Sequence, residues 1–119
     1  MIGLARGTRA QRALVTKAHR GGTEIVVPVV GIAETVRGIG PRDAAVNLTL
    51  GQFAPHHPLD EPTARLAGAL LGAANSNSTI DALVAAEAIS RQPSLLVTGD
   101  VDDLEPLLDG HSGVSLERI

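Results

Sequence analysis

Short aliphatic runs that alternate with helix-like segments are the strongest constraint on the fold of this chain. Residues 23–27 (TEIVV) and 94–98 (SLLVT) are rich in the β-branched and aliphatic side chains of buried strands. Shorter strands are expected at 53–57 and 113–116. Strands that alternate with helices predict an α/β fold with a mainly parallel sheet.

The expected helices begin and end at residues that favour helix ends. Asp60 is a suitable N-cap and Pro62 fits the first turn of the helix that follows. Gly21–Gly22 ends the first helix, and Ser78 or Thr79 caps the fifth. The expected helical segments are 5–19, 29–37, 43–51, 60–74, 80–91 and 101–108.

The composition indicates one domain over residues 1–119 with an aliphatic core. Hydrophobic residues make up 44% of the chain, but Phe53 is its only aromatic residue, so the core must consist of Ala, Val, Leu and Ile. The absence of cysteine excludes disulfides and thiolate zinc sites. The apolar runs are too short for a membrane span, and the N-terminus has no signal-like apolar run. We therefore expect a cytoplasmic protein without membrane contact.

Charge is unevenly distributed along the chain. Residues 1–23 hold five basic side chains and no acid, and residues 24–119 hold five basic and thirteen acidic ones, so charges of +5 and −8 give the net −3. The early basic residues are Arg6, Arg9, Arg12, Lys17 and Arg20. This asymmetry indicates either a surface that binds a polyanion beside an acidic pocket, or a solvated helix face.

Three acids lie where a turn or strand gives way to a helix-like run. They are Glu34, Asp81 and Asp100. In an open α/β sheet, such positions line the binding crevice. Carboxylates gathered there repel one another unless a divalent cation, a shared proton or a basic ligand offsets the charge. The pattern therefore indicates a metal site.

Each acid also has a structural interpretation. Asp100 is a suitable N-cap for the helix after it, and Asp81 follows Ser78 at capping-box spacing. Glu34 fits the exposed face of an amphipathic helix equally well. The acids at 102, 103 and 105 fit the first turn of a helix, where its dipole favours negative charge.

The order of these segments resembles a PIN domain, and most closely the VapC-like toxins of bacterial toxin–antitoxin pairs. The resemblance rests on TEIVVPVVGIAETVRG, then PLDEPTARLAGALLGA, then TIDALVAAEAISRQPSLLVTGDVDDLEPLL, and spans nearly the whole chain. It implies a three-layer α/β/α fold and a ribonuclease that depends on Mg²⁺ or Mn²⁺ and cleaves single-stranded RNA.

The resemblance also implies roles for particular residues. Glu34, Asp81 and Asp100 match the acids of the metal site, Asp103 is an auxiliary acid, and Thr98 matches a hydroxyl residue beside the site. The basic segment with Arg6, Arg9 and Arg12 is then expected to hold the RNA backbone. An antitoxin protein and a second copy of the chain are the expected partners.

One feature departs from the family pattern. PIN domains open with a central strand that ends in Asp, whereas no acid precedes Glu24 here. Three explanations are open: another segment fills the slot, a second copy pairs across the exposed edges, or the true gene product begins upstream. We favour the homodimer, because an uncovered central edge is prone to pairing.

Two functions follow from this departure. The first is a metal-dependent ribonuclease that works with three acids in place of four. The second is a catalytically inactive PIN-like module that keeps the fold and binds an antitoxin or another partner protein.

Overall fold

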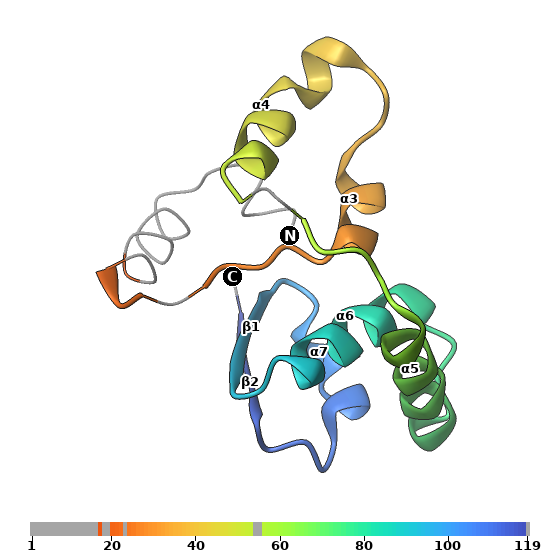
Figure 1. Ribbon diagram of the computed structural model, residues 1–119. Helices are drawn as coiled ribbons and strands as arrows, with labels where there is room; N and C mark the ends of the chain where they lie inside the picture. The colour runs from red at the N-terminus through yellow and green to blue at the C-terminus, as the bar shows by residue number, and fades with distance from the viewer. Residues whose placement is uncertain (1–16, 18–19, 23, 54–55, 119) are drawn as a thin grey trace. The chain divides into compact units, whose positions relative to one another are not determined.

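The computed structural model describes residues 17, 20–22, 24–53 and 56–118, apart from the side chains of residues 34, 35 and 49 (Figure 1). The chain divides into two units, residues 1–57 with residue 119, and residues 58–118. The described part is mixed α/β, with helices and a small parallel sheet of two strands. The single domain expected over 1–119 stays a prediction.

Helix α5 (Glu61–Ala74) opens the second unit and begins as the sequence predicts. The carboxylate of Asp60 accepts a hydrogen bond from the backbone N–H of Thr63 at 2.9 Å, and a proline occupies the first turn. Asn75 ends the helix in the left-handed conformation, with φ 49°. Its N–H donates to carbonyl groups of the last turn. Local capping chemistry therefore determines both ends of this helix.

The two strands of the second unit are joined by a helical crossover. Strand β1 (Ser94–Thr98) leads into α7 (Val101–Leu104) and the 3₁₀ helix η1 (Pro106–Leu108), and β2 (Val114–Arg118) returns parallel to β1. The strands pair in register from the first residue of each to the last (Figure 1). This β–helix–β connection is the arrangement that the sequence predicts for a parallel sheet.

The helix predicted over 101–108 is interrupted. The α-helical part ends at Leu104, and the chain continues as 3₁₀ helix from Pro106. Proline has no N–H to donate to the carbonyl group four residues earlier, so the α-helical ladder cannot continue through it. The leucines at 104, 107 and 108 are buried nonetheless, so both pieces contribute to the core.

Helix α6 (Thr79–Ser90) lies at the centre of the core of the second unit. It contacts α5, β1, α7 and η1. Three of its alanines, Ala82, Ala85 and Ala86, are 0% exposed. Small side chains on several faces allow four elements to approach one helix, and ordering alanine costs no side-chain entropy. The core is therefore aliphatic, as the composition predicts, and dominated by alanine and leucine.

The first unit contains helices α3 (Val29–Thr35) and α4 (Gly40–Gly51). Both fall on segments predicted as helical, although α4 begins three residues before the predicted start at Asp43. The helix predicted over 5–19 lies outside the described residues except for Lys17, which is helical. The pair Gly21–Gly22 follows as a turn, with Gly22 at φ 70°.

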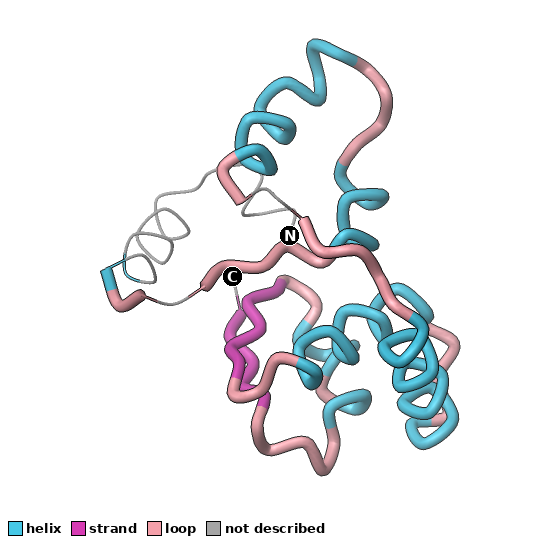
Figure 2. The backbone as a smooth tube through the Cα atoms, in the orientation of Figure 1, coloured by secondary structure: helices cyan, strands magenta, loops and turns pink. Residues whose placement is uncertain are grey.

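Two predicted strands are wrong in the part of the chain that the structure describes. Residues 24–28, which cover most of the strand predicted at 23–27, have no regular secondary structure (Figure 2). The same holds for Phe53, His56 and His57 of the strand predicted at 53–57. No strand occurs among the described residues of the first unit that could pair with either segment. The β-branched side chains at 25–27 favour a strand only where a partner is present.

Gly68 and Gly72 do not mediate close helix packing within the described residues. Both are exposed on α5, and a Cβ atom built on either meets nothing within 4 Å in the described structure. Because glycine in an exposed helix interior costs about 0.5–1 kcal/mol relative to alanine, we expect Gly68→Ala and Gly72→Ala each to stabilise the protein by that amount. Thermal unfolding followed by circular dichroism measures this.

The reverse exchange at the neighbouring exposed Ala69, to glycine, is the matched control and should lose a similar amount. If Gly68→Ala instead destabilised the protein, Gly68 would not be exposed as described, and another segment or molecule would cover this side of α5.

The capping carboxylate of Asp60 gives the stability a defined pH dependence. Hydrogen bonds from the side chain and backbone N–H of Thr63 lower the pKa of Asp60 below its ordinary value. The stabilisation is therefore complete above the pKa of the unfolded chain, about 4, and is lost as the pH falls through the lower pKa of the folded state.

Asn also caps helices but does not titrate there. As the pH falls from about 5 to 3, we therefore expect the melting temperature of the wild type to decrease more than that of Asp60→Asn. Asp109→Asn, at an exposed acid without a described hydrogen bond, is the matched control. Parallel pH profiles of the wild type and Asp60→Asn would refute the assignment.

Candidate metal centre

Asp100 follows β1 and Gly99 and occupies the N-cap position of α7. Its carbonyl oxygen accepts the N–H groups of Asp103 and Leu104 at 3.1 and 3.0 Å, but its side chain makes no capping hydrogen bond. The interpretation of its carboxylate as the helix cap is therefore wrong. The side chain is exposed, and no hydrogen bond or ion pair of its carboxylate is found within the described residues.

Thr98 shapes the turn that carries Asp100. Its side chain is buried, with the residue 8% exposed, and its Oγ1 accepts the backbone N–H of Asp100 at 3.0 Å. The sequence predicts a hydroxyl group beside the site, and the structure places it at the end of β1. This contact makes Thr98 a positioning residue for the backbone of Asp100. A contact of Thr98 with substrate stays a prediction.

Asp81 lies in the first turn of α6 and is half-buried. Ser78 occupies the N-cap position, but its side chain makes no capping hydrogen bond. Its backbone N–H instead donates to Oγ of Ser76 at 3.1 Å. The capping-box interpretation is therefore wrong for the hydroxyl of Ser78, which does not hold the start of this helix.

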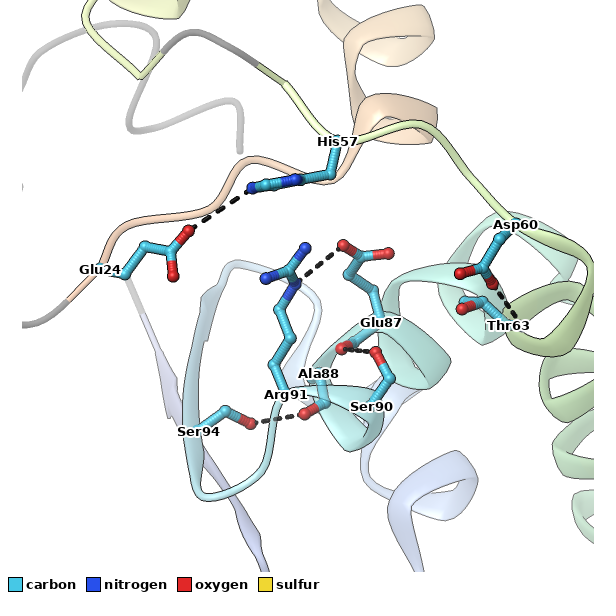
Figure 3. Close-up of polar contacts among 9 residues, drawn as sticks. All are labelled: Glu24, His57, Asp60, Thr63, Glu87, Ala88, Ser90, Arg91 and Ser94. Atoms are coloured by element: carbon cyan, nitrogen blue, oxygen red, sulfur yellow. Dashed lines mark hydrogen bonds and ion pairs between the residues drawn. The ribbon is translucent and has the colours of Figure 1, made fainter.

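The end of α6 is tied to the start of β1. Oγ of Ser94 donates to the carbonyl oxygen of Ala88 at 2.8 Å (Figure 3). β1 and α6 are also in contact with each other. The helix from Ala88 to its start is about 14 Å long, and the strand from Ser94 to Thr98 spans about 13 Å. That Asp81 and the Thr98–Asp100 turn lie close together stays a prediction.

The acids that follow Asp100 differ in their surroundings. Asp102 accepts a hydrogen bond from Nη2 of Arg118 on β2 at 3.1 Å, which links α7 to the sheet. Asp103, predicted as an auxiliary metal ligand, is exposed in the same short helix. Asp102 thus has a structural partner, and the auxiliary role of Asp103 stays a prediction.

The remaining predicted site residues belong to the first unit. Glu34 lies in the last turn of α3, and its side chain is not among those described. The predicted RNA-binding residues Arg6, Arg9 and Arg12 lie outside the described residues. Within the described part of the chain, no three His, Asp or Glu side chains gather into a group that could hold a metal ion.

Of the predicted site, Asp81 and Asp100 belong to the same unit, residues 58–118. Carboxylate oxygens are the ligands that Mg²⁺ prefers, and protein sites often bind it through one or two carboxylates while the ion keeps several waters. The chemistry of this pair fits Mg²⁺ or Mn²⁺.

Asp43 is the most buried acid of the described chain, and the sequence alone did not predict its structural role. It is 3% exposed. Its carboxylate accepts the backbone N–H groups of Arg37 at 3.1 Å, Gly38 at 2.8 Å and Ile39 at 3.2 Å. One side chain thus satisfies three successive donors of the loop between α3 and α4.

The AETVRG segment that supports the family resemblance has a structural role at the end of α3. Nη1 of Arg37 donates to the carbonyl oxygens of Ala33 and Val36, both at 3.0 Å. Gly38 follows at φ 76°, a conformation that favours glycine. The arginine and the glycine therefore terminate the helix. The pair Arg37–Gly38 followed by Asp43 is the sequence feature that marks the loop between α3 and α4.

Other charged side chains form pairs within each unit. Nε of Arg91 lies 3.1 Å from Oε1 of Glu87 one turn earlier on α6, and the Glu87 side chain is only 15% exposed. In the first unit, Nε2 of His57 lies 3.5 Å from Oε1 of Glu24 (Figure 3). Both contacts are structural and leave the candidate centre unchanged.

Comparisons with protein-family models, with curated proteins and with solved structures found no match. None of the described helices combines the length and apolar character needed to cross a bilayer.

The three hydrogen bonds to Asp43 predict a large effect of its removal. Asp43→Ala leaves three backbone N–H groups without their acceptor, and we expect a loss of about 1–3 kcal/mol in the free energy of unfolding. Asp43→Asn keeps one acceptor oxygen and should lose less. Urea unfolding followed by circular dichroism measures both, with the exposed neighbour Arg42→Ala as the control. Equal stability of the two alanine variants would disprove this role.

Proposed function

We propose that this protein is a metal-dependent endoribonuclease with a PIN-like fold that cleaves single-stranded RNA. The observation that carries the proposal is the placement of Asp100. Its carboxylate follows the carboxyl end of a parallel strand and is not used as a helix cap. Binding crevices form at this position in α/β sheets.

The order of motifs along the chain supports the same proposal. The DALVAAEA and SLLVTGD segments that resemble PIN domains are α6 and the β1–α7 turn, so the resemblance and the placement of the acids concern the same residues. The three-layer α/β/α arrangement and a cytoplasmic location are part of this proposal, as are RNA and an antitoxin as partners.

Each residue has a defined part in the proposed site. Asp81, Asp100 and Glu34 would hold Mg²⁺ or Mn²⁺, with Asp103 as an auxiliary acid. Thr98 positions the backbone of Asp100. The basic residues Arg6, Arg9 and Arg12 would hold RNA phosphates through salt-sensitive contacts. When bound, the metal lowers the pKa of a coordinated water and stabilises charge on the scissile phosphate.

A second function is favoured by one feature of the sequence. Residues 1–23 hold no acid that matches the first carboxylate of the family pattern. Under this alternative the chain is a catalytically inactive PIN-like module that binds an antitoxin or another protein. It differs from the first proposal in that it requires no affinity for a divalent cation.

Cleavage of a labelled single-stranded RNA with Mg²⁺ or Mn²⁺ tests the ribonuclease. We expect Asp81→Asn and Asp100→Asn each to reduce the rate on the order of 100-fold or more, since even residues that only support metal ligands cost about 10–100-fold. Asp109→Asn, at an exposed acid after η1, should retain full activity. Equal cleavage by the wild type and both site variants would show that the site is assigned wrongly.

Calorimetric titration with Mg²⁺ or Mn²⁺ separates the two functions. Saturable binding that weakens in Asp100→Asn supports the metal site whether or not the RNA tested is the right substrate. Absence of both binding and cleavage supports the inactive module.

A further inference from the structure

The second unit is strongly acidic, and one of its few cations lies at the carboxyl end of the sheet. Residues 58–118 contain ten acids and three arginines, which gives a formal charge of −7. Arg65 and Arg91 each pair with a glutamate one turn earlier on their own helix. Arg118 instead pairs with Asp102, 16 residues away on α7. Its ion pair therefore joins two different elements.

The register of the sheet places Arg118 beside the residue that positions Asp100. Arg118 is the last residue of β2 and the partner of Thr98, the last residue of β1. Neighbouring strands lie about 4.8 Å apart, and paired residues point to the same face of the sheet. Because the strands are parallel, Arg118 and the turn that leads to Asp100 share the carboxyl edge, where binding crevices form.

The contact with Asp102 defines where the guanidinium of Arg118 lies. Nη2 donates to Oδ1 of Asp102 at 3.1 Å, and Asp102 lies in the first turn of α7, two residues after Asp100. The arginine side chain therefore reaches from the end of β2 to the start of α7. This places a cation beside the short segment that carries the proposed metal ligand Asp100.

The ion pair leaves much of the guanidinium open to another anion. The side chains of Arg118 and Asp102 are 56% and 84% exposed, and exposed pairs contribute little to stability because water competes for both partners. A guanidinium has five N–H donors. Within the described residues, the bond to Asp102 is the one hydrogen bond found for this side chain. The remaining donors can therefore bind a ligand.

We propose that Arg118 binds a phosphate group of single-stranded RNA at the proposed metal site, and that Asp102 occupies the guanidinium until the phosphate replaces it. This inference rests on the proposed ribonuclease function. A guanidinium binds phosphate through two parallel hydrogen bonds, whereas its contact with Asp102 is a single bond. A cation at this edge also offsets the repulsion between the acids of the unit and the RNA backbone.

RNA affinity tests the phosphate contact without cleavage. Fluorescence anisotropy of a labelled single-stranded oligouridylate in EDTA measures it. We expect Arg118→Gln to weaken binding about ten-fold at low salt, because one charge-assisted hydrogen-bond contact is lost. The slope of log affinity against log salt should become shallower by about 0.7, the value for one phosphate of a single strand.

Arg65→Gln is the matched control, because Arg65 forms a comparable exposed ion pair with Glu61 on α5. It should bind the oligouridylate as the wild type does. Circular dichroism confirms that each variant is folded. Equal affinity of Arg118→Gln and the wild type overturns the proposal, and so does a wild type that binds no RNA.

The other end of the ion pair separates RNA binding from a structural role. If the pair only tied β2 to α7, Asp102→Asn and Arg118→Gln would break the same bond and have the same effect. Under the proposal, Asp102→Asn frees the guanidinium and strengthens RNA binding by more than Glu105→Gln, which removes an exposed charge nearby. This gain should vanish when Asp102→Asn is combined with Arg118→Gln. Weaker binding by Asp102→Asn, or a gain that persists in the double variant, overturns the role of Asp102.

The binding and cleavage assays fail separately. Cleavage by the wild type together with unchanged RNA affinity in Arg118→Gln would refute the phosphate contact and leave the ribonuclease in place. RNA binding that depends on Arg118 without any cleavage would support the contact and contradict the ribonuclease.

Discussion

The packing of four elements around helix α6 is the constraint on which the second unit depends. A chain with one aromatic residue has no large side chain around which a core could form. Instead, Ala82, Ala85 and Ala86 are fully buried and let α5, β1, α7 and η1 approach one helix closely. A larger side chain at these positions would overpack the core, because the three alanines are fully buried. Close approach of the backbones thus takes the place of bulky side chains.

The same helix determines where the candidate site lies. Ser94 binds the carbonyl group of Ala88, so the end of α6 and the start of β1 are fixed to each other. The strand contacts the helix, and the hydroxyl of its last residue, Thr98, accepts the N–H of Asp100 in the turn before α7. Asp81 and Asp100 are 19 residues apart in the sequence, and both belong to this unit, Asp81 in the first turn of α6 and Asp100 in the turn after β1.

The structural features that could be predicted from the sequence are those that depend on residues close together in the chain. Asp60 caps α5 as expected, because its partner Thr63 lies three residues away and the contact needs no tertiary structure. The strand predicted at 23–27 is wrong because strand formation depends on a partner that local sequence does not reveal. Asp43 was missed as a structural residue because its three hydrogen bonds depend on the left-handed turn at Gly38. The side chains of Ser78 and Asp100 were expected to cap helices, but favourable residue type at an N-cap position does not ensure the bond.

Strand β1 is the element on which the proposed site depends. Its carboxyl end leads to Asp100, and the hydroxyl of Thr98 accepts the N–H of Asp100. β1 pairs with β2 along its whole length, whereas the side chain of Asp100 makes no capping hydrogen bond to α7. The backbone that carries Asp100 is therefore held by the sheet, and its carboxylate is not committed to the helix that follows.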